Sequence, residues 1–238
     1  MPIRCLNAWV PELMSIESWN ADRHKPRFIV VEGPIGVGKT SLAKRLAEAF
    51  GGDLVLESDE KNPFLADFYR SGGRSALPAQ LFFLFERAKQ LESLRQADLF
   101  SPVRIADYHI LKDRLFAEMN LSPEEFLLYE QISSKLDLDV PEPDLVIYLQ
   151  ASVDVLMSRI ARRGREHERN IDRAYLDRVA ETYAKYFYDY DAGPLLIVNV
   201  SAIDPIGNDA DFDALFDQIR RVSSGRHFFN PAAAVAFA

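Results

Sequence analysis

Eight residues near the start of the chain have the types and spacing that bind the phosphates of a nucleotide. The segment Gly33-Pro34-Ile35-Gly36-Val37-Gly38-Lys39-Thr40 fits the pattern G-x-x-x-x-G-K-[ST] and directly follows the apolar residues 28–31. Glycines let the backbone wrap inward, so that amide groups and a helix N-terminus face the phosphate oxygens. Lys39 adds a positive charge near the β- and γ-phosphates, and the Thr40 hydroxyl can ligate Mg²⁺. We therefore predict that this loop and Ser41 bind the nucleotide.

Two acidic side chains are expected at the ends of the strands that follow this loop. Ligands of parallel sheets bind beyond the carboxyl ends of the strands. Glu57 ends a predicted strand over residues 53–57, where its carboxylate could take the proton of an attacking hydroxyl. Asp107 ends a predicted strand over residues 103–107 and could bind Mg²⁺ directly or through water. The alternatives are a solvated strand-end acid for Glu57 and a helix-capping aspartate for Asp107.

Arginines are concentrated in one later segment of this acidic chain. Residues 159–173 contain six arginines, spread over a predicted helix end and a loop with Gly164. Guanidinium groups stabilise the charge of a transferring phosphoryl group, so the segment suits a lid that closes over phosphates. A solvated helix face is the alternative interpretation. His167 lies in this segment without a metal-ligand spacing in the sequence, and we predict no metal there.

Alternating strands and helices must position these residues. Strands are expected over residues 27–32, 53–57, 103–107, 145–150 and 195–200. Helices are expected over residues 40–50, 62–70, 77–98, 112–119, 123–136, 154–162, 171–189 and 211–222, with Ser122 as one N-cap. Apolar strands separated by helices predict an α/β fold with a five-stranded parallel sheet covered on both faces. Residues 27–238 form the predicted domain, after an N-terminal extension over residues 1–26 that either packs on the domain, binds a partner or is disordered.

Composition excludes several classes of protein. The net charge of −8 argues against binding a nucleic-acid polymer or an anionic membrane. Cys5 is the only cysteine, so neither an intrachain disulfide nor a cysteine metal cluster is expected. No apolar run approaches the roughly 20 residues of a membrane span, and no targeting signal is apparent. We therefore expect a cytoplasmic enzyme.

Six ordered segments resemble the deoxynucleoside kinases, most closely the bacterial deoxyadenosine/deoxyguanosine kinase branch. They are Glu-Gly-Pro-Ile-Gly-Val-Gly-Lys-Thr at 32–40, Asn-Pro-Phe-Leu at 62–65, Gln-Leu-Phe-Phe-Leu-Phe at 80–85, Lys-Asp-Arg-Leu-Phe-Ala at 112–117, Asp-Leu-Val-Ile-Tyr-Leu-Gln-Ala at 144–151 and Arg-Gly-Arg-Glu at 163–166. The resemblance extends from about residue 27 to residues 229–231. It implies a P-loop kinase fold with an arginine-rich lid, a homodimer, and transfer of the γ-phosphoryl group of ATP, with Mg²⁺, to the 5′-hydroxyl of a deoxynucleoside.

The resemblance also assigns roles to individual residues. Glu57 matches the general base. The remaining matches are the base-contacting Gln80, Arg87 and Asp113, the sugar-binding Tyr69 and Glu168, and the lid arginines Arg159, Arg163 and Arg165. Arg87 and Asp113 can pair with the heteroatom edge of a purine. The alternatives are helix-surface residues for Gln80 and Tyr69 and a structural ion pair for Arg87 and Asp113.

One departure from the family concerns the reacting oxygens. Many members have an acid-Arg-Ser triplet where this chain has Asp107-Tyr108-His109, so another cation, a lid arginine or Arg114, is expected to replace the missing arginine. The alternatives are a thymidylate-type nucleoside-monophosphate kinase and a non-catalytic nucleotide-binding protein. A GTP switch would need an Asn-Lys-x-Asp motif, which this sequence lacks. The sequence leaves open adenine, guanine or pyrimidine preference and the preferred triphosphate donor.

Overall fold

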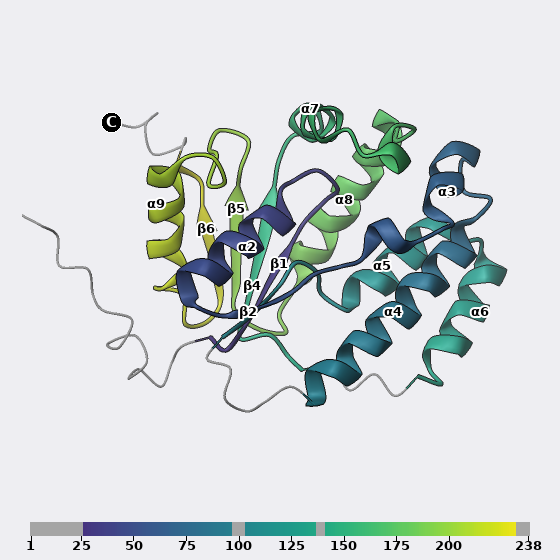
Figure 1. Ribbon diagram of the computed structural model, residues 1–238, viewed down its shortest axis with the longest axis horizontal. Coiled ribbons are helices and arrows are strands. Elements are labelled where there is room, and N and C mark those ends of the chain that lie inside the picture. The colour runs from purple at the N-terminus through teal and green to yellow at the C-terminus, as the bar shows by residue number, and fades with distance from the viewer. Residues whose placement is uncertain (1–25, 97–102, 137–140, 232–238) are drawn as a thin grey trace, which may run out of the picture.

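A computed structural model describes residues 26–96, 103–136 and 141–231, and it contains a six-stranded parallel sheet in the order β2-β3-β1-β4-β5-β6 (Figure 1). The strands are β1 (Phe28–Glu32), β2 (Asp53–Val55), β3 (Arg104–Ala106), β4 (Leu145–Gln150), β5 (Leu195–Asn199) and β6 (Arg226–Phe229). The helices are α2 (Lys39–Phe50), α3 (Leu65–Ser71), α4 (Ala76–Gln96), α5 (Leu111–Asn120), α6 (Pro123–Ser133), α7 (Val153–Arg163), α8 (Arg173–Asp189) and α9 (Asp209–Ile219), with short 3₁₀ helices η1 (Asp59–Lys61) and η2 (Glu166–Glu168). The expected α/β fold is therefore confirmed.

The middle of the sheet is apolar because both of its faces are covered. The side chains of β4 are buried from Leu145 to Leu149, as a central parallel strand requires. Tyr148 of β4 stacks on Phe187 of α8, with ring centroids 4.3 Å apart. On the other side, α2 packs on β1 and β3, and Phe50 at its end contacts Phe216 of α9.

Strand order places the loop after β1 at the centre of the sheet. Val30 of β1 is in register with Ala106 of β3 on one side and with Val146 of β4 on the other. The chain runs from β1 outward to β2 and later from β4 outward to β6, so the direction of winding changes beside β1. Such a switch point leaves a crevice at the carboxyl ends of the strands. The same ends carry the predicted phosphate loop.

Helices α3, α4, α5 and α6 group on one side of the molecule, and α9 lies with β6 on the other (Figure 1). Ser122 caps α6 as predicted: its hydroxyl accepts from the Glu125 amide, and the Glu125 carboxylate accepts from the Ser122 amide. None of the described helices is long and apolar enough to cross a membrane. The predicted extension falls on residues 1–25, which lie outside the described residues, and on residue 26.

The five-stranded prediction was wrong, because β6 adds a sixth strand beside β5. β6 is an edge strand whose side chains alternate between exposed and half-buried. It therefore lacks the continuous apolar run by which the inner strands can be found. β2 is also shorter than predicted and ends at Val55, which leaves Glu57 in the segment after the strand.

Candidate active site

The glycine-rich loop between β1 and α2 needs a glycine where it passes α7. Gly36 has φ +83°, and a Cβ there would lie 2.8 Å from Ile160 Cγ1 and 3.0 Å from the Leu156 carbonyl oxygen. Lys39 folds back over the loop, and its ammonium donates to the carbonyl oxygens of Gly33 at 2.7 Å and Pro34 at 3.1 Å. These carbonyls hold the ammonium inside the loop, where phosphate oxygens would bind.

Glu32, at the end of β1, supports the loop from below, a role that no pattern in the sequence indicated. Its buried carboxylate accepts from the backbone amides of Gly33 at 3.0 Å and His109 at 2.6 Å. The Tyr183 hydroxyl of α8 donates to it at 3.0 Å. One carboxylate therefore ties the phosphate loop to the segment after β3 and to α8.

Thr40 and Asp107 meet at the side of the loop, as the sequence predicts for a metal site. The Thr40 hydroxyl donates to Asp107 Oδ2 at 2.5 Å, and the backbone amide of Glu57 donates to Oδ1 at 2.8 Å. Burial raises the pKa of Asp107 in spite of these two hydrogen bonds, so a bound cation would stabilise its charged form. A hydroxyl and a carboxylate oxygen are ligands that suit Mg²⁺.

Glu57 lies between two cations. Its Oε2 accepts from the Lys112 ammonium at 2.5 Å, and its Oε1 pairs with the Arg87 guanidinium of α4. Burial alone would raise the pKa of Glu57, but Lys112 and Arg87 outweigh it and hold the pKa well below its usual range. Glu57 is therefore ionised and able to accept a proton once a substrate displaces one of its partners.

Arg87 joins Glu57 to a second buried carboxylate. The other end of its guanidinium pairs with Asp113 of α5, and the Tyr129 hydroxyl of α6 donates to Asp113 Oδ2 at 2.8 Å. Gln80 Nε2 donates to the Asp113 carbonyl oxygen at 3.3 Å. The side chains of Arg87, Asp113, Tyr129 and Gln80 are all buried. Arg87 Nε is buried and has no hydrogen-bond partner among the described residues.

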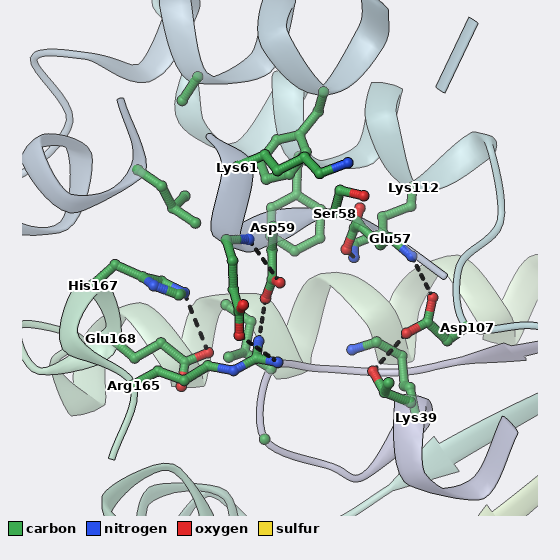
Figure 2. A pocket seen from close by; sticks show the side chains of 18 of the residues that line it. Lys39, Glu57, Ser58, Asp59, Lys61, Asp107, Lys112, Arg165, His167 and Glu168 are labelled. Carbon is green, nitrogen blue, oxygen red and sulfur yellow. Dashed lines mark hydrogen bonds and ion pairs between the residues drawn. The ribbon is translucent and has the colours of Figure 1, made fainter. Parts of the chain in front are cut away.

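The arginine-rich segment lies partly over the cavity, and its two arginines that line the cavity, Arg163 and Arg165, are paired with carboxylates. Figure 2 shows Arg165, His167 and Glu168 of this segment. Arg163 binds Glu168, with 3.0 Å from Nε to Oε2, and Arg165 pairs with Asp59 of η1. His167 brings a ring nitrogen within 4.8 Å of carboxylate oxygens of Asp59 and Glu168, a grouping that the sequence did not reveal. Both of these acids already hold an arginine, so the grouping is a closed ion-pair network.

Two other arginines lie elsewhere. Arg159 donates to the carbonyl oxygens of Val37 at 3.0 Å and Val200 at 2.9 Å, so it braces the phosphate loop from behind. Arg114 pairs with Glu118 and Glu130, and its side chain is 58% exposed, away from the cavity. Arg114 therefore does not replace the arginine that many family members have at the position of Tyr108.

One cavity of about 480 Å³ brings most of the predicted residues together. Figure 2 shows Lys39, Asp107, Glu57 and Lys112 on one side of it and Arg165, His167 and Glu168 on the other. The predicted residues that line it are Ile35, Gly36, Gly38, Lys39, Thr40, Ser41, Glu57, Tyr69, Gln80, Arg87, Asp107, Arg163, Arg165 and Glu168. The predicted residues outside its lining are Gly33, Pro34, Val37, Asp113 and Arg159. Sequence reasoning missed Lys112, which lines the cavity beside Glu57.

Comparisons with known proteins identify the family and the fold of the chain. The family model described as "Deoxynucleoside kinase" matches residues 29–224. Deoxyguanosine kinase of Bacillus subtilis is 37% identical over 82% of this chain and 97% of its own length, and deoxyadenosine/deoxycytidine kinase of the same organism is 29% identical over 84% and 96%. The structure of deoxyadenosine kinase from M. mycoides with bound dATP has a TM-score of 0.68 at 23% identity, over 82% of this chain and 99% of that one, and so shares the fold.

Proposed function

The chain belongs to the deoxynucleoside kinase family, and on that basis we propose that it transfers the γ-phosphoryl group of ATP to the 5′-hydroxyl of a purine deoxynucleoside. One observation carries the proposal: a phosphate loop and an ionised carboxylate, Glu57, line the same cavity as a buried hydrogen-bonding set suited to a base. Such an enzyme would serve nucleotide salvage.

The reaction follows from the positions of these groups. The phosphate loop amides and Lys39 hold the triphosphate, and the lid residues Arg163 and Arg165 close over it. Glu57 takes the proton of the 5′-hydroxyl as the new O5′–P bond forms. The bond between the γ-phosphorus and the bridging oxygen breaks, and ADP leaves with that oxygen. Most of the acceleration comes from in-line positioning and charge stabilisation.

Two oxygen donors support a magnesium ion as the second cofactor. Thr40 and Asp107 would hold Mg²⁺, which when bound neutralises phosphate charge. The Glu57 amide keeps Asp107 oriented toward Thr40. In this protein the carboxylate is thus fixed before the metal arrives.

The far end of the cavity supports a purine base and a 2′-deoxy sugar. Arg87 and Gln80 line this part of the cavity and offer a guanidinium and a side-chain amide to a base. Tyr69 and Glu168 line the same cavity, and we assign them to the 3′-hydroxyl, with the tyrosine crowding a 2′-hydroxyl. Asp113 lies behind Arg87 and would reach the base as Arg87 turns. The purine preference follows the names of the relatives and the Arg87–Asp113 pair.

A homodimer completes the proposal. Phe85 of α4 is 45% exposed, and Leu127 and Leu128 of α6 are 61% and 46% exposed. These two helices pack on one another and lie on the same side of the molecule (Figure 1). A second copy that covers this side would remove them from water, which is favourable.

A coupled assay for ADP release tests the activity. The purified protein is given Mg-ATP with each of the four deoxynucleosides and with dTMP. We expect ADP with deoxyguanosine or deoxyadenosine, and the faster of the two identifies the base. No ADP with any deoxynucleoside refutes the proposal; turnover of dTMP alone indicates a thymidylate-type kinase, and tight ATP binding without turnover a non-catalytic protein.

A further inference from the structure

Lys112 is a buried cation inside the candidate active site with no assigned role. It lies in the first turn of α5, lines the cavity, and has a side chain that is only 11% exposed. Taking an ammonium out of water is costly unless the charge is paired. Among the described residues its ion pair is with Glu57, at 2.5 Å from Nζ to Oε2. The carboxylate that pairs with Lys112 is thus the one assigned to accept the proton.

Lys112 also lines the cavity into which the phosphate loop opens. Lys39 of the loop lines the same cavity, and Figure 2 shows both lysines on the side that also carries Glu57 and Asp107. An anion that enters this part of the cavity would be attracted by both ammonium groups. Lys112 thus lies on the side of the cavity that holds both the proton acceptor and the phosphate loop.

The arginines that line the cavity are each held by a carboxylate. Arg87 is shared by Glu57 and Asp113, Arg163 is held by Glu168, and Arg165 is held by Asp59. Asp113, Glu168 and Asp59 keep their charge in the reaction. Arg87 and Lys112 both pair with Glu57, which loses its negative charge when it takes the proton. Arg87 is still held by Asp113 at that point, whereas Lys112 has no second ion pair among the described residues.

This coupling assigns a function to the pair. We propose that Lys112 is a catalytic residue whose ammonium moves from Glu57 to the oxygens of the transferring phosphoryl group as Glu57 takes the 5′-hydroxyl proton. The inference rests on the proposed kinase function. The balance is simple: the proton goes to Glu57, the negative charge on the acceptor side goes to the new phosphate ester, and the lysine stays protonated. Lys112 then supplies the positive charge that the arginine of the acid-Arg-Ser triplet would provide. In this chain Tyr108 stands at the position of that arginine.

A purely structural role for Lys112 predicts different behaviour. If the lysine only orients Glu57, its removal disturbs the nucleoside site in every state of the reaction. If it stabilises the transferring group, its removal weakens the transition state and spares the ground state. Affinity for a transition-state mimic separates the two cases without reference to turnover.

The experiment compares Lys112→Met with Lys112→Arg and with Lys61→Met, a change of an exposed lysine that lines the same cavity. Each variant is titrated with the preferred deoxynucleoside alone, with MgADP alone, and with deoxynucleoside plus MgADP and aluminium fluoride. We expect Lys112→Met to lower kcat and affinity for the aluminium fluoride complex by about 10²–10³-fold, as for other charge-stabilising donors, with nucleoside affinity largely unchanged. Lys112→Arg restores much of the loss, and Lys61→Met behaves like the wild type.

Equal losses of affinity for the nucleoside and for the aluminium fluoride complex overturn the role and leave Lys112 as a positioning residue. Loss of nucleoside binding together with a lowered Tm would show that Lys112→Met does not fold. In that case Lys112→Gln takes its place in the same comparison. The wild-type control separates the two proposals, because a wild-type protein that phosphorylates no deoxynucleoside refutes the kinase function itself. If the wild-type protein is active and Lys112→Met is as active as the wild type, only the proposed role of Lys112 is refuted.

Discussion

Replacing Tyr129 with phenylalanine removes a single hydroxyl from the buried network behind the active site. That hydroxyl donates to Asp113 Oδ2 at 2.8 Å, and the two residues are 3% and 2% exposed. The ring would keep its place beside Phe126, with ring centroids 6.2 Å apart, so packing is preserved. The substitution therefore tests one hydrogen bond to a charged, buried acceptor.

The magnitude follows from the charge and the burial of Asp113. A hydrogen bond to a charged group contributes about 1.5–3 kcal/mol, and a chain of this length shifts its Tm by roughly 2–4 °C for each kcal/mol. Tyr129→Phe should therefore lower the Tm by about 3–12 °C. Asp113 keeps its pair with Arg87, so we expect the fold to survive and KM for the deoxynucleoside to rise more than kcat falls.

Differential scanning calorimetry and urea unfolding measure this loss. Tyr188→Phe is the matched control, because Tyr188 of α8 is 76% exposed and the same atom is removed there. If the two phenylalanine variants melt together, the hydrogen bond to Asp113 contributes nothing to stability. The account of a pre-organised base site would then be wrong.

Three further changes test other parts of the structure. Gly36→Ala places a Cβ 2.8 Å from Ile160 Cγ1 at φ +83°, so ATP binding measured by calorimetry should be lost with the sheet intact. Glu57→Gln should lower kcat by about 10²–10⁴-fold and nucleoside affinity little, and equal losses would remove Glu57 from the base role. The Glu57 pKa is held well below its ordinary 4.5, so its contribution to stability is fully present above that pH and is lost as the pH falls through the folded-state pKa. The Tm gap between wild type and Glu57→Gln should stay constant from pH 7 to about pH 5 and then narrow as the pH falls further, without closing by about pH 3. Leu127→Glu should halve the mass found by light scattering if α6 forms the dimer interface, and an unchanged mass would exclude that interface.

Local patterns in the sequence were sufficient to locate the phosphate loop and the parallel sheet. The loop is one continuous segment whose conformation depends on its own glycines, and the inner strands are continuous apolar runs. The capping of α6 was also predictable, because Ser122 and Glu125 are three residues apart and meet in the first turn of the helix.

Partners that meet across the fold were beyond the reach of these patterns. Glu57 and Lys112 are 55 residues apart in sequence, and Glu32 and Tyr183 are 151 apart. Neither pair has a spacing that periodicity could reveal, because only the sheet order brings them together. The resemblance identified Arg87 and Asp113 as site residues. That Glu57 and Asp113 share the guanidinium of Arg87 depends, however, on how α4 and α5 pack.

The ion pairs of the cavity also explain how an acidic protein can hold a polyanion. Each arginine that lines the cavity is neutralised by a carboxylate: Arg87 by Glu57 and Asp113, Arg163 by Glu168, and Arg165 by Asp59. Unpaired, such partly buried cations would raise the free energy of the ligand-free protein. Under the proposed function, a triphosphate would bind by exchange, with phosphate oxygens replacing the carboxylates on Arg163 and Arg165. The released acids, Asp59 of η1 and Glu168 of η2, line the same cavity, where hydroxyl groups of a nucleoside would satisfy them. Binding of the two substrates would then be coupled through the same ion pairs, a coupling that neither the net charge of −8 nor the count of arginines alone would reveal.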